Sequence, residues 1–251
     1  MKNAARLDTA LVERGLVASR ERARALILAG QVRVNGQPVT KAGAPVGADA
    51  DITVATPDHP YVGRGGLKLA HALDVFGIIV EGRTALDIGA STGGFTDVLL
   101  QRGALRVVAL DVGHGQLDWK IRSNPRVIAL ERLNARSLTP DQLPPDVRRF
   151  DIVTIDVSFI SLRQILPAVP PLLAEKADVI ALVKPQFEAG RDDVGKGGIV
   201  RDPLVQERVI QEVASAADRI GLARRGLVES PITGMEGNRE FLMHLQRAAH
   251  A

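Results

Sequence analysis

Short apolar runs recur through the last two thirds of the chain, and the segments between the first five runs have helical patterns. The runs read TALDIG, RVVALDV, RVIALER, DIVTIDV, DVIALVK, RRGLVES and EFLMHLQR. The first five are continuous and apolar, as strands buried on both faces of a sheet should be. Because strands that alternate with helices build doubly wound parallel sheets, the pattern predicts an α/β fold with a Rossmann-like sheet.

The last two runs are joined in a different way. Only the short segment PITGMEGN separates them. A parallel crossover needs about a dozen residues or more, so the final strand is predicted to run antiparallel, at the edge of the sheet.

Residue types that are missing or scattered exclude several kinds of chemistry. The 251 residues include no cysteine, which excludes disulfides, cysteine zinc sites and a thiolate nucleophile. The five histidines are scattered, without the HExxH spacing, so no metal site is predicted. No apolar run approaches the ~18 residues of a membrane span, and the first residues lack a signal-peptide core. We therefore expect a cytoplasmic protein without a membrane or metal partner.

The formal net charge of +3 arises in the first quarter of the chain. Residues 1–66 hold nine Lys or Arg and six Asp or Glu, whereas the remainder holds 23 of each. This distribution predicts a small module that binds a polyanion, followed by a neutral body.

The basic module is predicted to be a small α+β unit. Helical patterns span residues 6–16 and 19–30, with Ser19 as the N-cap of the second helix. Residues 32–39, VRVNGQPV, predict a hairpin that turns at the Asn-Gly pair, and residues 51–54 predict a short strand. Guanidinium groups suit RNA phosphates, although charge alone fits a solvated helix face equally well. The candidate RNA-binding residues are Arg6, Arg14, Arg20, Arg22, Arg24 and Lys41.

A glycine-rich loop follows the first predicted strand, where sheets of this kind bind ligands. It reads DIGASTGGF over residues 87–95, and its glycines allow a ligand to approach the backbone at a helix N-terminus. Asp111 ends the second strand, where a carboxylate can accept hydrogen bonds from the ribose of an adenosine-containing cofactor. A tight connection and a helix cap are the alternatives. The predicted cofactor-binding residues are Gly89, Ala90, Ser91, Gly93, Gly94, Phe95, Asp111 and Val112.

NAD and S-adenosylmethionine (SAM) both fit this outline. The antiparallel final strand and a DxGxSxGGF loop in place of GxGxxG favour SAM. The fourth strand ends in DVSF, not in the Asn/Asp-Pro-Pro-aromatic motif of enzymes that methylate base amines, and C5 methylation of pyrimidines needs a cysteine. What remains are Asp156, Lys184 and Glu240 at strand ends, and Lys68 on the helix before the sheet. Lys184 on its own is equally consistent with a lysine that reaches solvent.

Two resemblances add to this interpretation. The pattern RLDxxLxxRGLxxSRxxAxxLIxxGxVxVNGxxVxK resembles the S4 RNA-binding domain, and the order Lys-Asp-Lys-Glu resembles the tetrad of FtsJ-type 2′-O-ribose methyltransferases. An S4 domain joined to an FtsJ-like domain is the architecture of the TlyA family of haemolysin-named rRNA methyltransferases. The segments GRGGLKL, ALDIGASTGGFTDVLLQRGA, DVGHGQL, DVSFISL, LVKPQFE and GNREF match that family in order.

The resemblance implies an S4-like RNA-binding domain at residues 1–58, a linker at 59–64 and a SAM-dependent methyltransferase domain at 65–251. It also implies a substrate, ribosomal RNA or a ribosomal subunit, that is methylated at cytidine 2′-O in 16S or 23S rRNA. The linker reads HPYV where the family has Arg-x-Trp-Val, so a linker role in SAM affinity is not carried over.

The resemblance further implies that the tetrad is catalytic. A ribose 2′-hydroxyl must lose its proton as it attacks the methyl group, and a neutral lysine can accept that proton. Lys184 is the expected base, and Lys68 is expected to hold the RNA or the 2′-oxygen. Asp156 and Glu240 are expected to orient the two lysines.

Three other functions stay open on the sequence alone. The first is a membrane-lytic haemolysin, but the sequence has no long cationic amphipathic helix to support it. A non-catalytic RNA-binding factor of ribosome assembly would not need the intact loop and tetrad. A small-molecule methyltransferase would leave the basic module without a purpose.

Overall fold

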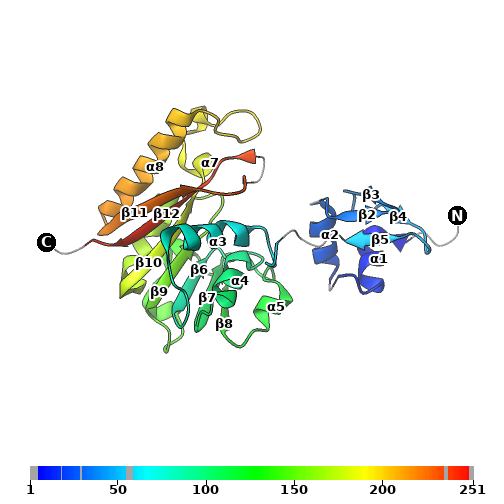
Figure 1. Cartoon of the computed structure of the whole chain (residues 1–251), viewed down its shortest axis with the longest axis horizontal. Helices are drawn as coiled ribbons and strands as arrows, with labels where there is room; N and C mark the ends of the chain where they lie inside the picture. Colours follow the sequence, from blue (N-terminus) through cyan, green and yellow to red (C-terminus); the bar gives the residue numbers. More distant parts are fainter. Residues whose placement is uncertain (1–4, 18, 29, 55–58, 235–236, 249–251) are drawn as a thin grey trace. The chain divides into compact units, whose positions relative to one another are not determined.

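The computed structural model describes residues 5–17, 19–28, 30–54, 59–234 and 237–248. The chain divides into two compact units, Met1–Pro60 and Tyr61–Ala251, so the boundary falls within the predicted linker (Figure 1). Each unit has an apolar core of its own.

The first unit combines the two predicted short helices with two small antiparallel sheets. The predicted hairpin and short strand form one of these sheets, whereas the β1–β4 pair was not predicted. Leu7, Leu11, Ile27 and Val32 are fully buried and form the centre of its core. Its elements are β1 (Ala5–Arg6), α1 (Leu7–Glu13), α2 (Arg20–Leu28), β2 (Val32–Val34), β3 (Gln37–Pro38), β4 (Pro45–Val46) and β5 (Ile52–Val54).

Local sequence signals set the ends of these elements. The Ser19 hydroxyl accepts a hydrogen bond from the backbone N–H of Arg22 (3.2 Å), which is the predicted N-cap of α2. Asn35 and Gly36 both have positive φ angles (50° and 78°), as the tight turn between β2 and β3 requires. The predicted cap and hairpin are thus confirmed.

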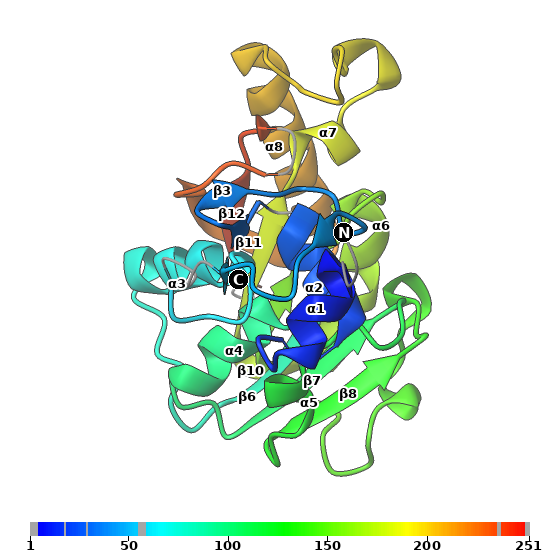
Figure 2. The same cartoon turned by 90° about the vertical axis from the view of Figure 1, so that its right-hand side faces the viewer.

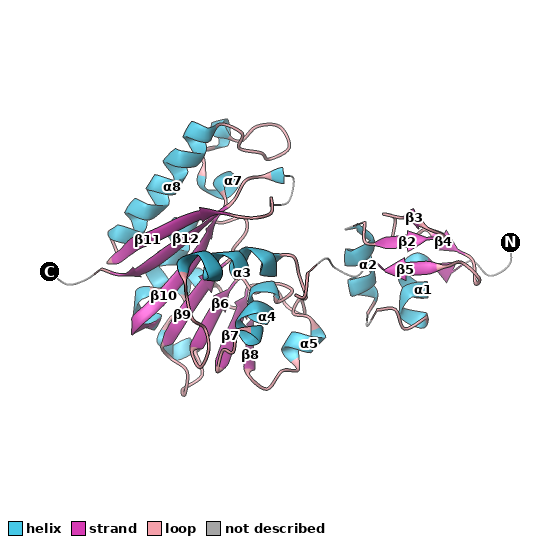
Figure 3. Ribbon diagram, in the orientation of Figure 1, coloured by secondary structure: helices cyan, strands magenta, loops and turns pink. Residues whose placement is uncertain are grey.

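A seven-stranded sheet forms the middle of the second unit (Figure 3). Its strands, in spatial order, are β11 (Leu222–Glu229), β12 (Phe241–Arg247), β10 (Leu173–Val183), β9 (Phe150–Ile155), β6 (Thr84–Ile88), β7 (Arg106–Asp111) and β8 (Val127–Glu131). The α-helices are α3 (Gly65–Phe76), α4 (Gly94–Gln101), α5 (Trp119–Arg122), α6 (Leu162–Ile165), α7 (Pro185–Glu188) and α8 (Pro203–Asp218). Short 3-10 helices are η1 (Ala135–Ser137), η2 (Pro140–Gln142), η3 (Leu166–Ala168), η4 (Pro170–Leu172) and η5 (Arg191–Asp193).

The final strand β12 is antiparallel, as predicted, but its predicted place at the edge is wrong. It pairs with β10 on one side and with β11 on the other, and the edges of the sheet are β11 and β8. Between two neighbours, the backbone groups on both sides of β12 are paired, whereas an edge strand leaves one row unpaired. The third apolar run, predicted to be buried on both faces, is the edge strand β8 and is only half-buried.

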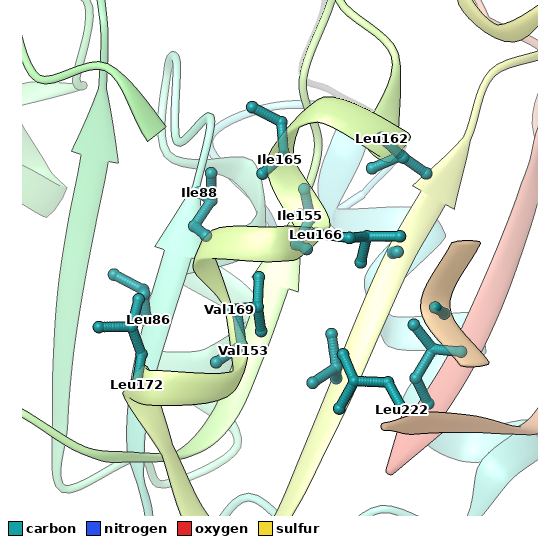
Figure 4. Close-up of a cluster of buried hydrophobic side chains, with 14 of the residues drawn as sticks. Leu86, Ile88, Val153, Ile155, Leu162, Ile165, Leu166, Val169, Leu172 and Leu222 are labelled. Atoms are coloured by element: carbon teal, nitrogen blue, oxygen red, sulfur yellow. The ribbon is translucent and has the colours of Figure 1, made fainter. Parts of the chain in front are cut away.

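Both faces of the sheet are covered, which explains why the central strands are apolar throughout. Leu69 of α3 and Leu99 of α4 pack on one face with other buried residues. On the other face, Leu86 and Ile88 of β6 lie beneath the segment from α6 to η4 (Figure 4). Figure 2 shows α3 and α6 on opposite sides of the sheet. Consecutive strand residues point to opposite faces, so each strand supplies both cores.

Candidate active site

The residues predicted to carry the chemistry lie at one edge of the sheet in the second unit. Asp111 is the last residue of β7, Asp156 follows β9, and Lys184 follows β10. Glu240 directly precedes β12, whose first residue pairs with the last residue of β10. Because β12 runs antiparallel, its beginning lies where the parallel strands end, and Glu240 joins the same edge.

The loop after β6 is closed by a glycine that no other residue can replace without strain. Gly89 has a φ of +86°, and a Cβ atom there would lie 2.3 Å from the carbonyl oxygen of Asp156. The two loops are also linked by a hydrogen bond, in which the backbone N–H of Asp156 donates to the carbonyl of Ile88 (2.9 Å). Gly89 therefore lets the loops after β6 and β9 meet.

The carboxylate of Asp111 is fixed by two backbone hydrogen bonds. Its Oδ2 accepts from the N–H of Ser91 (2.8 Å), and its Oδ1 accepts from the N–H of Gly113 (2.7 Å). Each carboxylate oxygen can accept a second hydrogen bond. Asp111 is therefore oriented and still has acceptor capacity for hydroxyl groups of a ligand.

A cavity of about 470 Å³ opens beside Asp111, within the ~300–1,000 Å³ typical of small-molecule sites. Of the predicted cofactor residues, Gly89, Ser91, Asp111 and Val112 line this cavity. The predicted catalytic residue Asp156 lines it as well, so the cavity reaches the tetrad.

The other predicted cofactor residues, Ala90, Gly93, Gly94 and Phe95, are not among the described residues that line the cavity. Phe95 is 3% exposed and belongs to the apolar core under α3. A Cβ atom on Gly94 would lie 3.1 Å from the backbone nitrogen of Gly66, so this glycine lets α4 approach α3. Gly94 and Phe95 thus serve packing in the structure.

Sequence reasoning missed further residues that line the cavity. They follow β7, β8 and β9, at the same edge of the sheet: Gln116, Leu133, Asn134, Ala135, Val157, Ser158, Phe159 and Ile160. A signal was present, since ligands of such sheets bind outside the carboxyl ends of the strands. The loop after the third strand, at residues 132–137, contains no glycine or acidic residue that would single it out.

The four tetrad residues form two ion pairs. Lys184 Nζ lies 2.6 Å from Asp156 Oδ1 and also donates to the Ser158 hydroxyl (3.0 Å). Lys68 on α3 donates to the Glu240 carboxylate. The side chains of Lys68 and Lys184 are only 8% and 10% exposed, so each buried ammonium group has a carboxylate partner.

The two ion pairs are neighbours. A Cβ atom on Gly65, three residues before Lys68 in α3, would lie 3.9 Å from Asp156 Oδ2. The strand order and this contact place α3 beside the ends of β9 and β10. The structure therefore brings all four predicted catalytic residues to one edge, next to the cavity.

An exposed aromatic side chain stands at the rim of the cavity. Phe159 is 91% exposed, and its φ of +63° is rare for a bulky residue. Its ring lies 5.1 Å from that of Phe187, and Lys184 Nζ lies 5.9 Å from the Phe187 ring. The structure thus holds a flat apolar surface in a strained position close to the tetrad.

The buried carboxyl group of Glu188 braces the loop that carries Phe159. It accepts hydrogen bonds from the Ser161 hydroxyl (2.5 Å) and from the backbone N–H of Leu162 (2.7 Å). Burial raises the pKa of Glu188, against these hydrogen bonds, which lower it.

A second buried carboxyl group lies at the end of β6, just before the glycine-rich loop. Asp87 is fully buried and accepts hydrogen bonds from the hydroxyls of Thr96 (2.6 Å) and Thr154 (2.9 Å). Burial raises the pKa of Asp87 to about 6, because these hydrogen bonds only partly offset the loss of water.

The basic residues predicted in the first unit have unequal surroundings. The guanidinium of Arg14 donates to the carbonyls of residues 47, 48 and 50, and so ties α1 to the loop before β5. Lys41 is exposed and Arg22 is half-buried. The other three, Arg6, Arg20 and Arg24, surround the buried carboxylate of Asp8.

Three further observations concern the described residues only. They contain no group of three His, Asp or Glu side chains arranged to hold a metal ion. None of their helices is long and apolar enough to cross a membrane. Another cavity, of about 660 Å³, lies between α8 and β11, and none of the predicted site residues lines it.

Comparisons with known proteins show the family to which the chain belongs. The model of the FtsJ-like methyltransferase family matches residues 61–247, and that of the S4 domain matches residues 5–52. The chain is 48% identical over 247 residues to the 16S/23S rRNA (cytidine-2′-O)-methyltransferase TlyA of Mycobacterium tuberculosis, covering 98% of this chain and 91% of the relative. It is 42% identical to Hemolysin A of Brachyspira hyodysenteriae, covering 95% and 98%. A solved hemolysin-named structure from Streptococcus thermophilus matches with a TM-score of 0.77 and 43% identity, covering 99% of this chain and 90% of that one.

Proposed function

The chain belongs to the FtsJ-like methyltransferase family and, within it, to the TlyA group, and from this premise we propose that it transfers a methyl group from SAM to a ribose 2′-hydroxyl of ribosomal RNA. The name of the mycobacterial relative specifies cytidine 2′-O in 16S and 23S rRNA, and we propose the same target class for this chain.

The cavity at the ends of β6, β7 and β9 fits SAM. Asp111 offers oriented carboxylate oxygens for the two ribose hydroxyls, and Gly89 and Ser91 place backbone beside it. Asn134, which follows β8 in the same cavity, supplies an amide that can pair with the edge of an adenine ring. SAM would supply an electrophilic methyl group at this site.

The tetrad supplies the groups that a ribose hydroxyl needs. Lys184 reaches the edge beside the cavity, where its neutral amine form, left after the ammonium group has released a proton, can accept the proton of the attacking hydroxyl as the general base. Asp156 and Ser158 fix the position of its amino group through contacts of 2.6 and 3.0 Å. Lys68, whose charge is balanced by Glu240, is placed to hold the 2′-oxygen or an RNA phosphate.

Two surfaces suit a nucleic-acid substrate. The S4-like unit exposes arginines for RNA phosphates. At the rim of the cavity, Phe159 offers a face on which a base could stack, which is how many proteins hold unpaired nucleotides. A ribosomal substrate also fits the expected cytoplasmic location.

The single observation that carries this proposal is the meeting of the two lysine–carboxylate pairs beside the Asp111 cavity. The test uses ribosomal subunits from cells that lack the gene, purified protein and SAM, followed by mapping of 2′-O-methylation. We expect methylation of cytidine in at least one rRNA. RNA binding without methyl transfer would support the non-catalytic assembly factor instead, and methylation of a base atom would overturn the 2′-O assignment.

The relatives named as haemolysins favour membrane lysis as the second candidate function. Leakage of a dye from liposomes tests it directly. Leakage caused by the wild-type protein and by a Lys184→Ala variant alike would establish a lytic activity that is independent of the tetrad.

A further inference from the structure

The first unit buries one carboxylate among three guanidinium groups. Asp8 in α1 is 0% exposed, and its Oδ1 and Oδ2 accept from Arg6 Nε (3.0 Å) and Arg6 Nη2 (3.1 Å). Its Oδ2 also accepts from Arg20 Nη2 (3.3 Å) and Arg24 Nε (3.2 Å), both from α2. We call Asp8 and these three arginines the Asp8 cluster.

The Asp8 cluster carries more positive charge than the buried carboxylate needs. One bidentate arginine, such as Arg6, already satisfies a carboxylate. Arg20 and Arg24 each give Asp8 a single nitrogen, and about half of each of the three arginine side chains is exposed (52–53%). Guanidinium groups with further N–H donors therefore reach the surface at fixed positions.

The arginines come from two different elements and converge on Asp8. Arg6 belongs to β1, whereas Arg20 and Arg24 lie one turn apart on α2. A Cβ atom on Gly43 would lie 3.0 Å from Arg6 Nη1, so Arg6 is also confined from this side. Long side chains that are ordered before binding lose less conformational entropy when a ligand arrives.

We propose that Asp8 is a positioning residue for RNA binding, a buried acid that holds Arg6, Arg20 and Arg24 in a fixed array for the phosphates of an RNA strand. The inference rests on the proposed RNA-binding role of this unit and deepens it. It assigns a function in polyanion binding to the one group of the cluster whose charge opposes that binding.

For the change in RNA affinity caused by Asp8→Asn, the proposal predicts the opposite direction from simple electrostatics. Asp8→Asn makes the unit one charge more positive, so charge alone predicts tighter binding of RNA. If Asp8 positions the arginines, the same variant binds RNA more weakly, because an uncharged amide with one acceptor oxygen cannot hold three guanidinium groups. We expect a loss of about fivefold or more in affinity.

The experiment measures binding of a fluorescent RNA duplex to the full-length protein by anisotropy, at several salt concentrations. Circular dichroism and thermal unfolding report whether the Asp8→Asn protein is folded. Equal or tighter binding by a folded Asp8→Asn protein would overturn the inference. Absence of salt-dependent RNA binding by the wild-type protein would instead overturn the proposed RNA-binding role itself, so the two failures are distinguishable.

A second pair of variants keeps the buried acid in place, in case Asp8→Asn does not fold. Arg24→Lys retains the charge but cannot reproduce the Nε–H contact with Asp8, and we expect it to weaken RNA binding about threefold or more. Arg33→Lys makes the same change at an exposed residue of β2, outside the Asp8 cluster and outside the predicted RNA-binding residues, and serves as the control. If both variants bind RNA as the wild type does, fixed guanidinium positions have no role and the proposal fails.

Discussion

Each unit of the molecule buries an aspartate completely, and the two aspartates have opposite surroundings. Hydrogen bonds from Arg6, with those from Arg24 and Arg20, hold the pKa of Asp8 well below its ordinary value despite burial. Asp87 in the second unit receives hydrogen bonds from two threonine hydroxyls, and burial raises its pKa to about 6. Burial by itself therefore does not decide the charge of a carboxyl group; the groups that donate to it do.

The same contrast extends to the cations of the two units. In the first unit, three arginines share one acid and remain half-exposed, which leaves a surplus of charge at the surface. In the second unit, Lys68 and Lys184 are buried, and each has one carboxylate partner. Surplus surface charge suits attraction of a polyanion, whereas balanced buried pairs suit the handling of a proton at a defined atom.

The largest expected effect concerns the balanced pairs. Lys184→Ala removes the proposed base, and we expect turnover to fall at least ~100-fold while SAM and RNA binding stay near normal. The measurement is single-turnover methyl transfer at saturating RNA and SAM, from about pH 6 to 10. Lys176→Ala, at the exposed opposite end of β10, is the matched control. Wild-type rates for Lys184→Ala across the pH range would place the base elsewhere.

Removal of the surplus charge should affect a different quantity. Deletion of residues 1–60 should lower RNA affinity by about tenfold or more. It should also make affinity less dependent on salt: the slope of log affinity against log salt concentration should fall by about 0.7–0.9 for each phosphate that the protein no longer neutralises. SAM binding should survive. RNA binding that keeps its affinity and salt slope would assign the RNA contacts to the second unit and break the comparison.

The deletion has a matched control that follows from the structure. The backbone N–H of Val62 donates to Asp97 Oδ2 (2.8 Å), and a Cβ atom on Gly66 would lie 2.5 Å from the ring of Tyr61. Deletion of residues 1–66 removes these interactions within the second unit as well. We expect that longer deletion to lower the thermal stability of the methyltransferase unit, whereas deletion of residues 1–60 should not.

A third prediction separates cofactor binding from both charge systems. Asp111→Ala removes an oriented carboxylate and should weaken SAM binding by roughly 1–3 kcal/mol. Asp111→Asn keeps one acceptor oxygen and should lose less. Isothermal titration calorimetry with the folded variants measures both, and unchanged affinity in Asp111→Ala would remove this residue from the site.

Much of the fold was predictable because it follows from local pattern. The apolar runs indicated the strands, and the rule that ligands bind at the carboxyl ends of parallel strands placed Asp111, Asp156 and Lys184 at one edge. The family resemblance is confirmed by the comparisons. The insertion of β12 between β10 and β11 was not predictable, since a hairpin can pair on either side and no local signal selects one.

Contacts between distant residues account for the rest. The pairing of Lys68 with Glu240 joins residues 172 positions apart, which no spacing rule reveals. Phe95 looked like part of the ligand loop because it adjoins the glycines, but its apolar ring is buried against α3. In the sequence, Asp8 is one of the six acids of the first quarter and a position of the S4-like pattern, whereas the fold makes it the shared partner of three arginines.

A prediction about pH tests the contrast between the two buried aspartates. The pKa of the Asp87 carboxyl group is near 3.8 without burial, and burial raises this pKa to about 6 in the folded protein. Between these values the folded state holds one proton more than the unfolded state, so its contribution to stability is present below about pH 4 and is lost as the pH rises to 6. A rise in pKa from 3.8 to about 6 corresponds to a loss of about 3 kcal/mol.

Asp87→Asn should remove that dependence, because an amide does not titrate and can still pair with the hydroxyls of Thr96 and Thr154. The measurement compares the free energy of unfolding of wild type and variant from about pH 4 to 7. The free energy of unfolding of the variant should increase relative to that of the wild type as the pH rises from about 4 to 6. Asp8 should not change the free energy of unfolding with pH above about pH 5. Its pKa is held low, so its carboxylate is charged in both the folded and the unfolded state in that range. Parallel curves for the two proteins would mean that Asp87 is ionised throughout, and that two threonine hydroxyls stabilise a buried carboxylate as well as three arginines do.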